Sequence, residues 1–278
     1  MTKRFKSPNN LIVFFCSALL LLFPGNVIGQ SAPVATRDPN AVALAGQSLR
    51  ALAGLTPLID ITLQASTTYI AGSDQEIGPA TLTARGNQES LVTLNLTSGQ
   101  RQEIRRGVAG VWIGTDGTAH AIATHNCFLD ADWFFPAFSL EALSTDPTLV
   151  ITLVGQEVRG GEAVFHVVLL RYLPQPSPDA TALIQSVSVM HLYLDAASLL
   201  PVVLAFNIHP DTDATGNLSV EIHLGAYQSF QGVQVPTRIQ KYLQNSLLLD
   251  LTVTNATINS GVPDSFFMLP NVSAGGAQ

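Results

Sequence analysis

After residue 57 the chain consists largely of short runs in which apolar and polar residues alternate one by one. This period of two places the apolar side chains of a strand on one face, as in antiparallel sheets with one buried face. Turn-forming Gly, Asn and Asp residues separate the runs. The clearest runs cover residues 58–65, 92–97, 220–224 and 247–254. The pattern predicts a mainly β, curved antiparallel sheet of about nine to eleven strands.

A single well-delimited helix is predicted before the first strand. Asp38 is suited to cap its N-terminus, and Pro39 fits the first helical position. Gly54, followed closely by Pro57, is expected to end it. The predicted apolar stripe of this helix comprises Val42, Ala45, Leu49, Leu52 and Ala53.

The middle of the chain carries an unusual concentration of aromatic residues. Residues 127–143 read as an irregular loop that leads into a short helix starting near Pro136. We interpret the aromatic side chains as the lining or plug of an apolar cavity between the sheet and the helices that cover it. Plain core packing is the alternative interpretation. The candidate ligand-binding residues are Trp112, Trp133, Phe134, Phe135 and Phe138.

A proline-rich segment, residues 174–178, is predicted to be a long hairpin loop. It would join strands at 163–173 and 186–195, both of which are apolar on nearly both faces. Another part of the chain should therefore cover the sheet at this point. We find no internal repeat, so the sequence favours a single domain over residues 38–270.

The first residues have the features of a secretory signal peptide. Lys3, Arg4 and Lys6 precede an apolar run at 11–23, and cleavage is expected after Gly29. We therefore expect a soluble exported protein, periplasmic or secreted, with no transmembrane segment in the mature chain. A retained N-terminal anchor is the alternative. The expected layout is a signal peptide at 1–29, a flexible arm at 30–37, the domain, and a disordered tail at 271–278.

Composition excludes two classes of protein. Apolar residues make up 47% of the chain and charged residues 12%, which is incompatible with general disorder. The formal net charge of -7 argues against a nucleic-acid-binding protein of the usual basic kind. Removal of the signal peptide would also remove Cys16 and leave Cys127 alone, so we expect no internal disulfide.

The sequence contains no nucleophile elbow, phosphate-binding loop or dinucleotide fingerprint. Its densest group of potential ligands has a spacing that matches no metal motif, so we expect a hydrogen-bonded loop, no metal and no cofactor. This group comprises His120, His125, Cys127, Asp130 and Asp132. A secreted hydrolase that uses His125, Cys127 and Asp130 is the least favoured hypothesis. We expect no catalysis.

Three arginines, Arg101, Arg105 and Arg106, fall in one predicted strand or turn. Charged side chains of this kind are typical of a solvated sheet edge, where they prevent strand-to-strand aggregation. We therefore predict an exposed position for this group.

The order of elements and several local motifs resemble the periplasmic lipoprotein-carrier (LolA/LolB-like) superfamily. The shared order is a capped N-terminal helix, a long meander, a central aromatic helical segment and a closing pair of strands. The motifs that carry the resemblance are GEAVFHV at 161–167, LYLD at 192–195 with LLPV at 199–202, GVQVP at 232–236, TVTNATIN at 252–259 and PDSFF at 263–267.

This resemblance implies an incomplete β-barrel wrapped over helices, with an apolar concave face that takes acyl chains. No cysteine stands at the expected cleavage site to tether the chain to a membrane. Our leading hypothesis is thus a binding protein without catalytic activity whose partner is an apolar small molecule or lipid. The alternative is an envelope sensor or interaction module of the same fold that binds an envelope protein, with the aromatic residues as plain core.

Overall fold

The computed structural model describes residues 36–272, and the signal peptide and the terminal part of the tail predicted above lie outside this range. The described chain contains three α-helices and two short 3-10 helices: α1 (Pro39–Ala53), η1 (Thr124–Phe128), α2 (Ala137–Ala142), α3 (Pro178–Val187) and η2 (Asp264–Phe267). The strands are β1 (Asp60–Ala71), β2 (Asp74–Arg85), β3 (Glu89–Leu96), β4 (Gly99–Arg106), β5 (Ala109–Ile113), β6 (Ala119–Ala121), β7 (Leu149–Arg159), β8 (Glu162–Arg171), β9 (Met190–Asp195), β10 (Pro201–Ile208), β11 (Leu218–Phe230), β12 (Val233–Leu243) and β13 (Ser246–Ile258).

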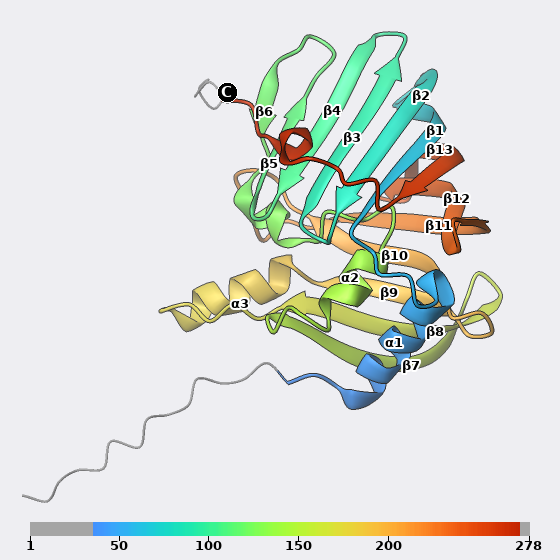
Figure 1. Ribbon diagram of the computed structural model, residues 1–278. Helices are drawn as coiled ribbons and strands as arrows, with labels where there is room; N and C mark the ends of the chain where they lie inside the picture. The colour runs from blue at the N-terminus through green and yellow to red at the C-terminus, as the bar shows by residue number, and fades with distance from the viewer. Residues whose placement is uncertain (1–35, 273–278) are drawn as a thin grey trace, which may run out of the picture. The chain divides into compact units, whose positions relative to one another are not determined.

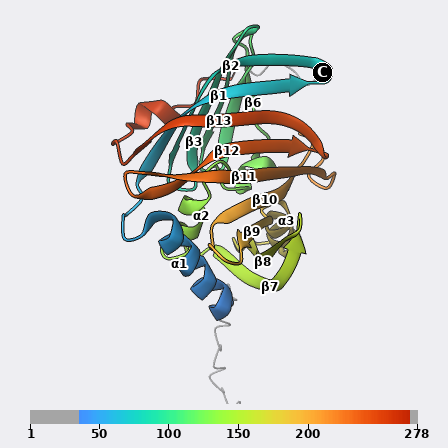
Figure 2. The ribbon, with the colours of Figure 1, turned by 90° about the vertical axis from the view of Figure 1, so that its right-hand side faces the viewer.

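All the described strands belong to one antiparallel sheet (Figure 1). Its order is β6-β5-β4-β3-β2-β1-β13-β12-β11-β10-β9-β8-β7, so β1 and β13 pair at its middle and β6 and β7 form its two edges. The sheet is strongly curved but does not close (Figure 2). The predicted incomplete barrel is confirmed, with thirteen strands instead of nine to eleven.

The predicted N-terminal helix is confirmed at both ends. The carboxylate of Asp38 accepts a hydrogen bond from the Asn40 N–H, and Gly54 ends the helix with a φ of 60°. That left-handed conformation is strained for residues with a Cβ, which explains the glycine. Ala45, Leu52 and Ala53 of the predicted stripe are buried, whereas Val42 is exposed, and the buried face also includes Ala41, Leu44 and Ser48.

The alternation in the first strand is confirmed from Ile61 onward, but Ile59 was wrongly assigned to the buried face. Ile61, Leu63 and Ala65 are buried, whereas Ile59 lies before β1 and is exposed. The reason is Asp60, whose buried carboxylate accepts hydrogen bonds from the backbone N–H groups of residues 260–262. These bonds compensate the desolvation of the carboxylate and fasten the start of β1 to the segment after β13.

The main core lies on the inner face of the sheet, beneath α1 and α2. Both helices pack together there, and α1 also contacts β7 and β12 (Figures 1 and 2). The short helix predicted near Pro136 is confirmed as α2. The aromatic segment that leads into it places Phe134, Phe135 and Phe138 among the most deeply buried side chains of the described chain.

The prediction of a long hairpin loop around residues 174–178 was wrong, because most of this connection is helix α3. β8 and β9 are antiparallel neighbours, as expected, but β9 starts at Met190 instead of residue 186. Ser177 and Pro178 occupy the N-cap and first position of α3. The helix packs on β8 and η1 and supplies part of the predicted cover. No helix in residues 36–272 is long and apolar enough to cross a membrane.

Candidate ligand-binding groove

Two adjoining cavities of about 200 Å³ each lie on the inner face of the sheet, beyond the packed core. Both are lined by Trp112 of β5 and by Trp133, and we call them together the tryptophan groove. Their combined size falls within the range of small-molecule sites, roughly 300–1,000 Å³. The other residues that line both cavities are Glu103 and Lys241. Apolar residues that line one of them are Val92, Leu94, Ile113, Ile122, Leu129, Phe206, Ile208, Leu248 and Leu249.

The curvature of the sheet creates the groove, because its lining comes from strands that are distant in the sheet order. β3, β4 and β5 form one wall, and β10, β12 and β13 contribute to the other. The walls are joined where η1 meets the end of β10. There the Asn126 side-chain amide donates to the His209 carbonyl at 2.8 Å and accepts from the His209 N–H at 2.8 Å. These buried bonds hold the two walls together.

The two tryptophans differ in exposure. Trp112 is 42% exposed and stacks on His120 of β6, with the ring centroids 4.0 Å apart and nearly parallel. Trp133 is buried and contacts Phe134 edge-to-face at 5.4 Å. The groove therefore has one aromatic wall open to solvent and one fixed to the core.

The structure divides the five candidate ligand-binding residues into two groups. Trp112 and Trp133 line the groove, whereas Phe134, Phe135 and Phe138 line neither of its cavities. Those three phenylalanines belong to the main core, where Phe135 and Phe138 pack edge-to-face with centroids 5.7 Å apart. The groove and the core are continuous, because Trp133 belongs to both.

Positive groups are concentrated in the groove. The ammonium of Lys241 lies 4.6 Å from the centroid of the Trp133 ring, and the guanidinium of Arg101 lies 4.9 Å from that of Tyr69. Such cation–π contacts partly replace hydration. Arg105 donates to the carbonyls of Asn126 and Leu129 at 3.0 Å each. Burial lowers the pKa of Lys241, and the carboxylate of Glu103 acts in the opposite direction.

Sequence reasoning missed the charged part of the groove. The prediction that the arginine group lies at a solvated edge was wrong for Arg105, which is buried, because β5 and β6 continue the sheet beyond β4. The position of Lys241 in the sequence could have indicated the charged part of the groove. It continues the inward-facing series Val235, Thr237 and Ile239 of β12, where a lysine is out of place unless it has a function.

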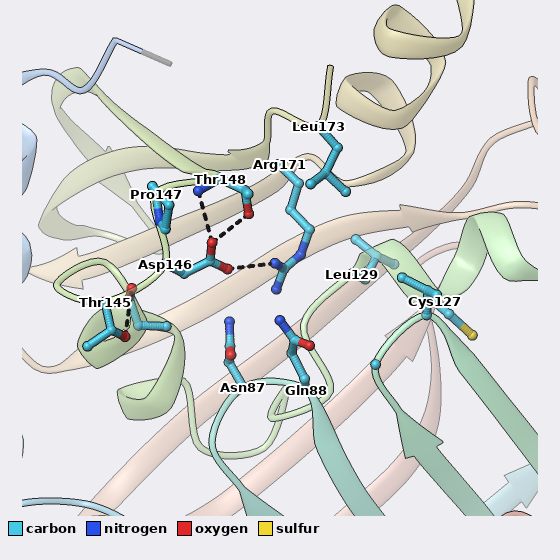
Figure 3. Close-up of a pocket in the computed structure, with 13 residues that line it drawn as sticks. Asn87, Gln88, Cys127, Leu129, Thr145, Asp146, Pro147, Thr148, Arg171 and Leu173 are labelled. Carbon is cyan, nitrogen blue, oxygen red and sulfur yellow. Dashed lines mark hydrogen bonds and ion pairs between the residues drawn. The ribbon is translucent and has the colours of Figure 1, made fainter. Parts of the chain in front are cut away.

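A larger cleft of about 530 Å³ lies between the start of β3 and the end of β8 (Figure 3). The charged side chain of Arg171 lines this cleft, but it already has partners within the chain. It forms ion pairs with Asp130 and, at 3.0 Å, with Asp146, and it donates to the Phe128 carbonyl at 3.1 Å. Arg171 thus cross-links three segments of the chain, which is a structural role.

Next to this network, Asp132 is buried and accepts two hydrogen bonds from Ser139, one from its N–H at 3.0 Å and one from its hydroxyl at 2.8 Å. Burial, together with the neighbouring carboxylate of Asp130, raises the pKa of Asp132 to about 8. Asp130 forms an ion pair with Arg171, whereas no ion pair among the described residues involves Asp132.

The polar constellation noted in the sequence does not form a metal centre. No group of three or more His, Cys, Asp or Glu side chains in residues 36–272 is arranged to hold a metal ion. His125 Nε2 lies 3.1 Å from the Pro210 carbonyl, and His120 stacks on Trp112. Cys127 is buried, and burial raises the pKa of its thiol, which disfavours a nucleophilic thiolate.

No protein-family model matches the chain, and no curated protein matches its sequence. Solved structures do match the fold. A LolA superfamily protein from Nitrosomonas europaea aligns with a TM-score of 0.52 and 11% identity over 86% of this chain and 99% of its own. A domain from Vibrio parahaemolyticus, described as an outer membrane lipoprotein-sorting protein, aligns with a TM-score of 0.51 and 10% identity over 82% and 96%.

A DUF1329 family protein from Desulfovibrio piger aligns with a TM-score of 0.50 and 11% identity over 82% of this chain and 96% of its own. At such identities the likeness concerns the fold. The match spans most of each chain. The chain therefore has the LolA-like fold.

Proposed function

We propose that this protein is an exported, non-catalytic binding protein that holds an apolar ligand, an acyl chain or lipid, in the tryptophan groove. The observation that carries the proposal is the pair of adjoining cavities lined by both tryptophans on the inner face of a LolA-like sheet. The Vibrio parahaemolyticus relative, described as a lipoprotein-sorting domain, supports an acyl ligand.

The groove is suited to an acyl chain because most of its lining is aliphatic or aromatic. Each methylene group transferred from water would contribute about 0.8 kcal/mol. Both walls belong to one hydrogen-bonded sheet, so the site is largely preformed and little ordering has to accompany binding. No covalent step is required for such a function.

The direct test is organic extraction of the purified protein, exported through its own N-terminus, followed by mass spectrometry. We expect a lipid or fatty acyl compound in stoichiometric amount, either as purified or after incubation with phospholipid vesicles. A protein that stays empty in both cases would contradict the proposal and favour an envelope protein as the partner instead.

Substitution of a residue in the groove tests whether the ligand binds there. Trp112→Asp places a charge on the open wall of the groove, so it should abolish lipid recovery. Because Trp112 is 42% exposed, the variant should still fold, which circular dichroism can verify. Phe266→Asp is the matched control, since Phe266 is an aromatic residue of 45% exposure that lines neither cavity. Equal lipid recovery from both variants would place the ligand elsewhere.

A further inference from the structure

Several hydrogen-bond donors of the tryptophan groove have no acceptor. The indole N–H of Trp133 and the Nε–H groups of Arg101 and Arg105 are buried and lack a hydrogen-bond partner among the described residues. Trp133 and Arg105 are themselves more than nine-tenths buried, with 6% and 7% of their surface exposed. Buried polar groups are normally paired, and each unpaired one costs stability. Trp133 lines both cavities, Arg101 lines one and Arg105 the other, so each cavity has two such donors.

Lys241, which is half-buried, is a fourth positive or donor group of the groove. Within residues 36–272, none of the ion pairs involves Lys241. Its ammonium instead lies over the Trp133 ring, and Lys241 lines both cavities. Burial and the neighbouring charge of Arg105 lower its pKa, and the carboxylate of Glu103 acts in the opposite direction.

The charges that line the groove do not balance. Arg101, Arg105 and Lys241 are basic, and two carboxylates line the groove, those of Glu103, 4.0 Å from Arg105, and of Asp130. Oδ1 of Asp130 is paired with Arg171, and its Oδ2 is buried without a hydrogen-bond partner among the described residues. The groove is therefore locally positive in a chain whose net charge is -7. A local excess of cations in a concave apolar site attracts anions.

From this arrangement we infer that the ligand is an anionic amphiphile, with an acyl chain along the apolar walls and an acidic head group, such as a carboxylate, at Lys241 and the unpaired donors of Trp133 and Arg105. This inference rests on the proposed function and specifies its ligand class. An anionic head group accepts several hydrogen bonds at once and would supply an acceptor for these groups. A cationic head group would meet like charges, and a neutral alcohol would leave Lys241 uncompensated.

The test compares decanoate with 1-decanol, which have the same chain and differ in the charge of the head group. Binding is measured by calorimetric titration of the full chain at about pH 8, where the acid is ionised. We expect decanoate to bind at least about tenfold more tightly, equivalent to about 1.4 kcal/mol. In Lys241→Met, which retains an unbranched apolar side chain, decanoate should lose most of this advantage while 1-decanol binds unchanged.

Arg238→Gln provides the matched control. Arg238 lies on the same strand, is exposed and faces away from the groove, so its loss changes the net charge equally. It should leave the preference for decanoate intact. If Lys241→Met does not fold, the comparison of the two ligands with the unaltered protein still tests whether the head group is anionic.

The outcomes separate this inference from the proposed function. Equal binding of decanoate and 1-decanol to the unaltered protein would overturn the anionic head group but retain the apolar groove. Absence of binding by either compound would overturn both. If Lys241→Met and Arg238→Gln lose the preference for decanoate equally, the preference arises from the overall charge of the protein. That result would overturn the role of Lys241.

Discussion

The two ends of the inner face of the sheet differ in side-chain packing and in the pairing of their charged groups. At the end covered by α1 and α2, Phe134, Phe135 and Phe138 fill the interior, and Arg171 is paired with two carboxylates. At the other end, Trp112 and Trp133 line open cavities, and Lys241 has no ion-pair partner among the described residues. We call these the filled end and the open end.

The comparison separates residues that stabilise the fold from those available for binding. At the filled end, the three phenylalanines are packed and Arg171 is paired within the chain, so changes to these residues should affect stability. At the open end, apolar surface and hydrogen-bond donors remain unsatisfied, so changes there should affect ligand binding more than stability. The aromatic residues fall on both sides of this division, which their sequence spacing does not reveal.

The largest expected effect is that of Arg171→Met at the filled end. The substitution leaves the buried carboxylate of Asp130 without its partner and also frees Asp146. Removing one member of a buried ion pair costs about 3–5 kcal/mol, and we expect the upper part of this range because two carboxylates are affected. Urea denaturation followed by circular dichroism measures the change. A loss below about 1 kcal/mol would show that the network is not structural.

Phe135→Ala should be nearly as destabilising. The ring is fully buried and packs against Phe138, so its removal leaves a cavity that costs about 3–5 kcal/mol. In the fraction that remains folded, the affinity for decanoate should stay close to that of the unaltered protein. If the variant is stable but no longer binds decanoate, Phe135 belongs to the binding site. The distinction between the two ends would then be wrong.

The pH dependence of stability provides a further test. Burial and the neighbouring Asp130 carboxylate raise the pKa of Asp132 to about 8 in the folded protein, above its value in the unfolded chain. The folded state then binds more protons than the unfolded state between these two values. The free energy of unfolding should therefore decrease as the pH rises from about 4 to about 8.

Asp132→Asn should make this profile flatter, because an amide keeps the contacts to Ser139 and does not ionise. The profile is measured by urea denaturation at several pH values. Asp179→Asn, at an exposed position in α3, controls for the change of net charge. Parallel profiles for Asp132→Asn and the unaltered protein would contradict the assignment of the proton to Asp132.

The sequence was sufficient to predict the fold because the strands are amphipathic and the α1 boundaries carry strong local signals. Asp38, Pro39 and Gly54 act within one or two turns of helix, so their effect can be read without tertiary information. The burial of Val92, Leu94 and Leu96 follows directly from their alternation. Helix α3 was missed because the prolines before it were assigned to a loop, although Ser177 and Pro178 mark a helix start.

The lining of the groove was predicted only in part, because it depends on the curvature of the sheet. Trp112 and Trp133 were selected as aromatic residues, and the same criterion selected three core phenylalanines. Whether an aromatic ring borders a cavity depends on which strands face each other across the interior, which spacing along the chain does not specify. Glu103 and Arg105 reach the groove for the same reason, since β4 faces β10 across it.

The most direct test of the open end as a binding site is a titration followed by intrinsic fluorescence. The chain contains two tryptophans, and both line the groove. Decanoate should therefore cause a saturable change in tryptophan emission with one binding site per chain. Trp133→Phe should retain a saturable change through Trp112. Tryptophan emission that stays constant while calorimetry detects binding would place the ligand outside the groove and contradict the account.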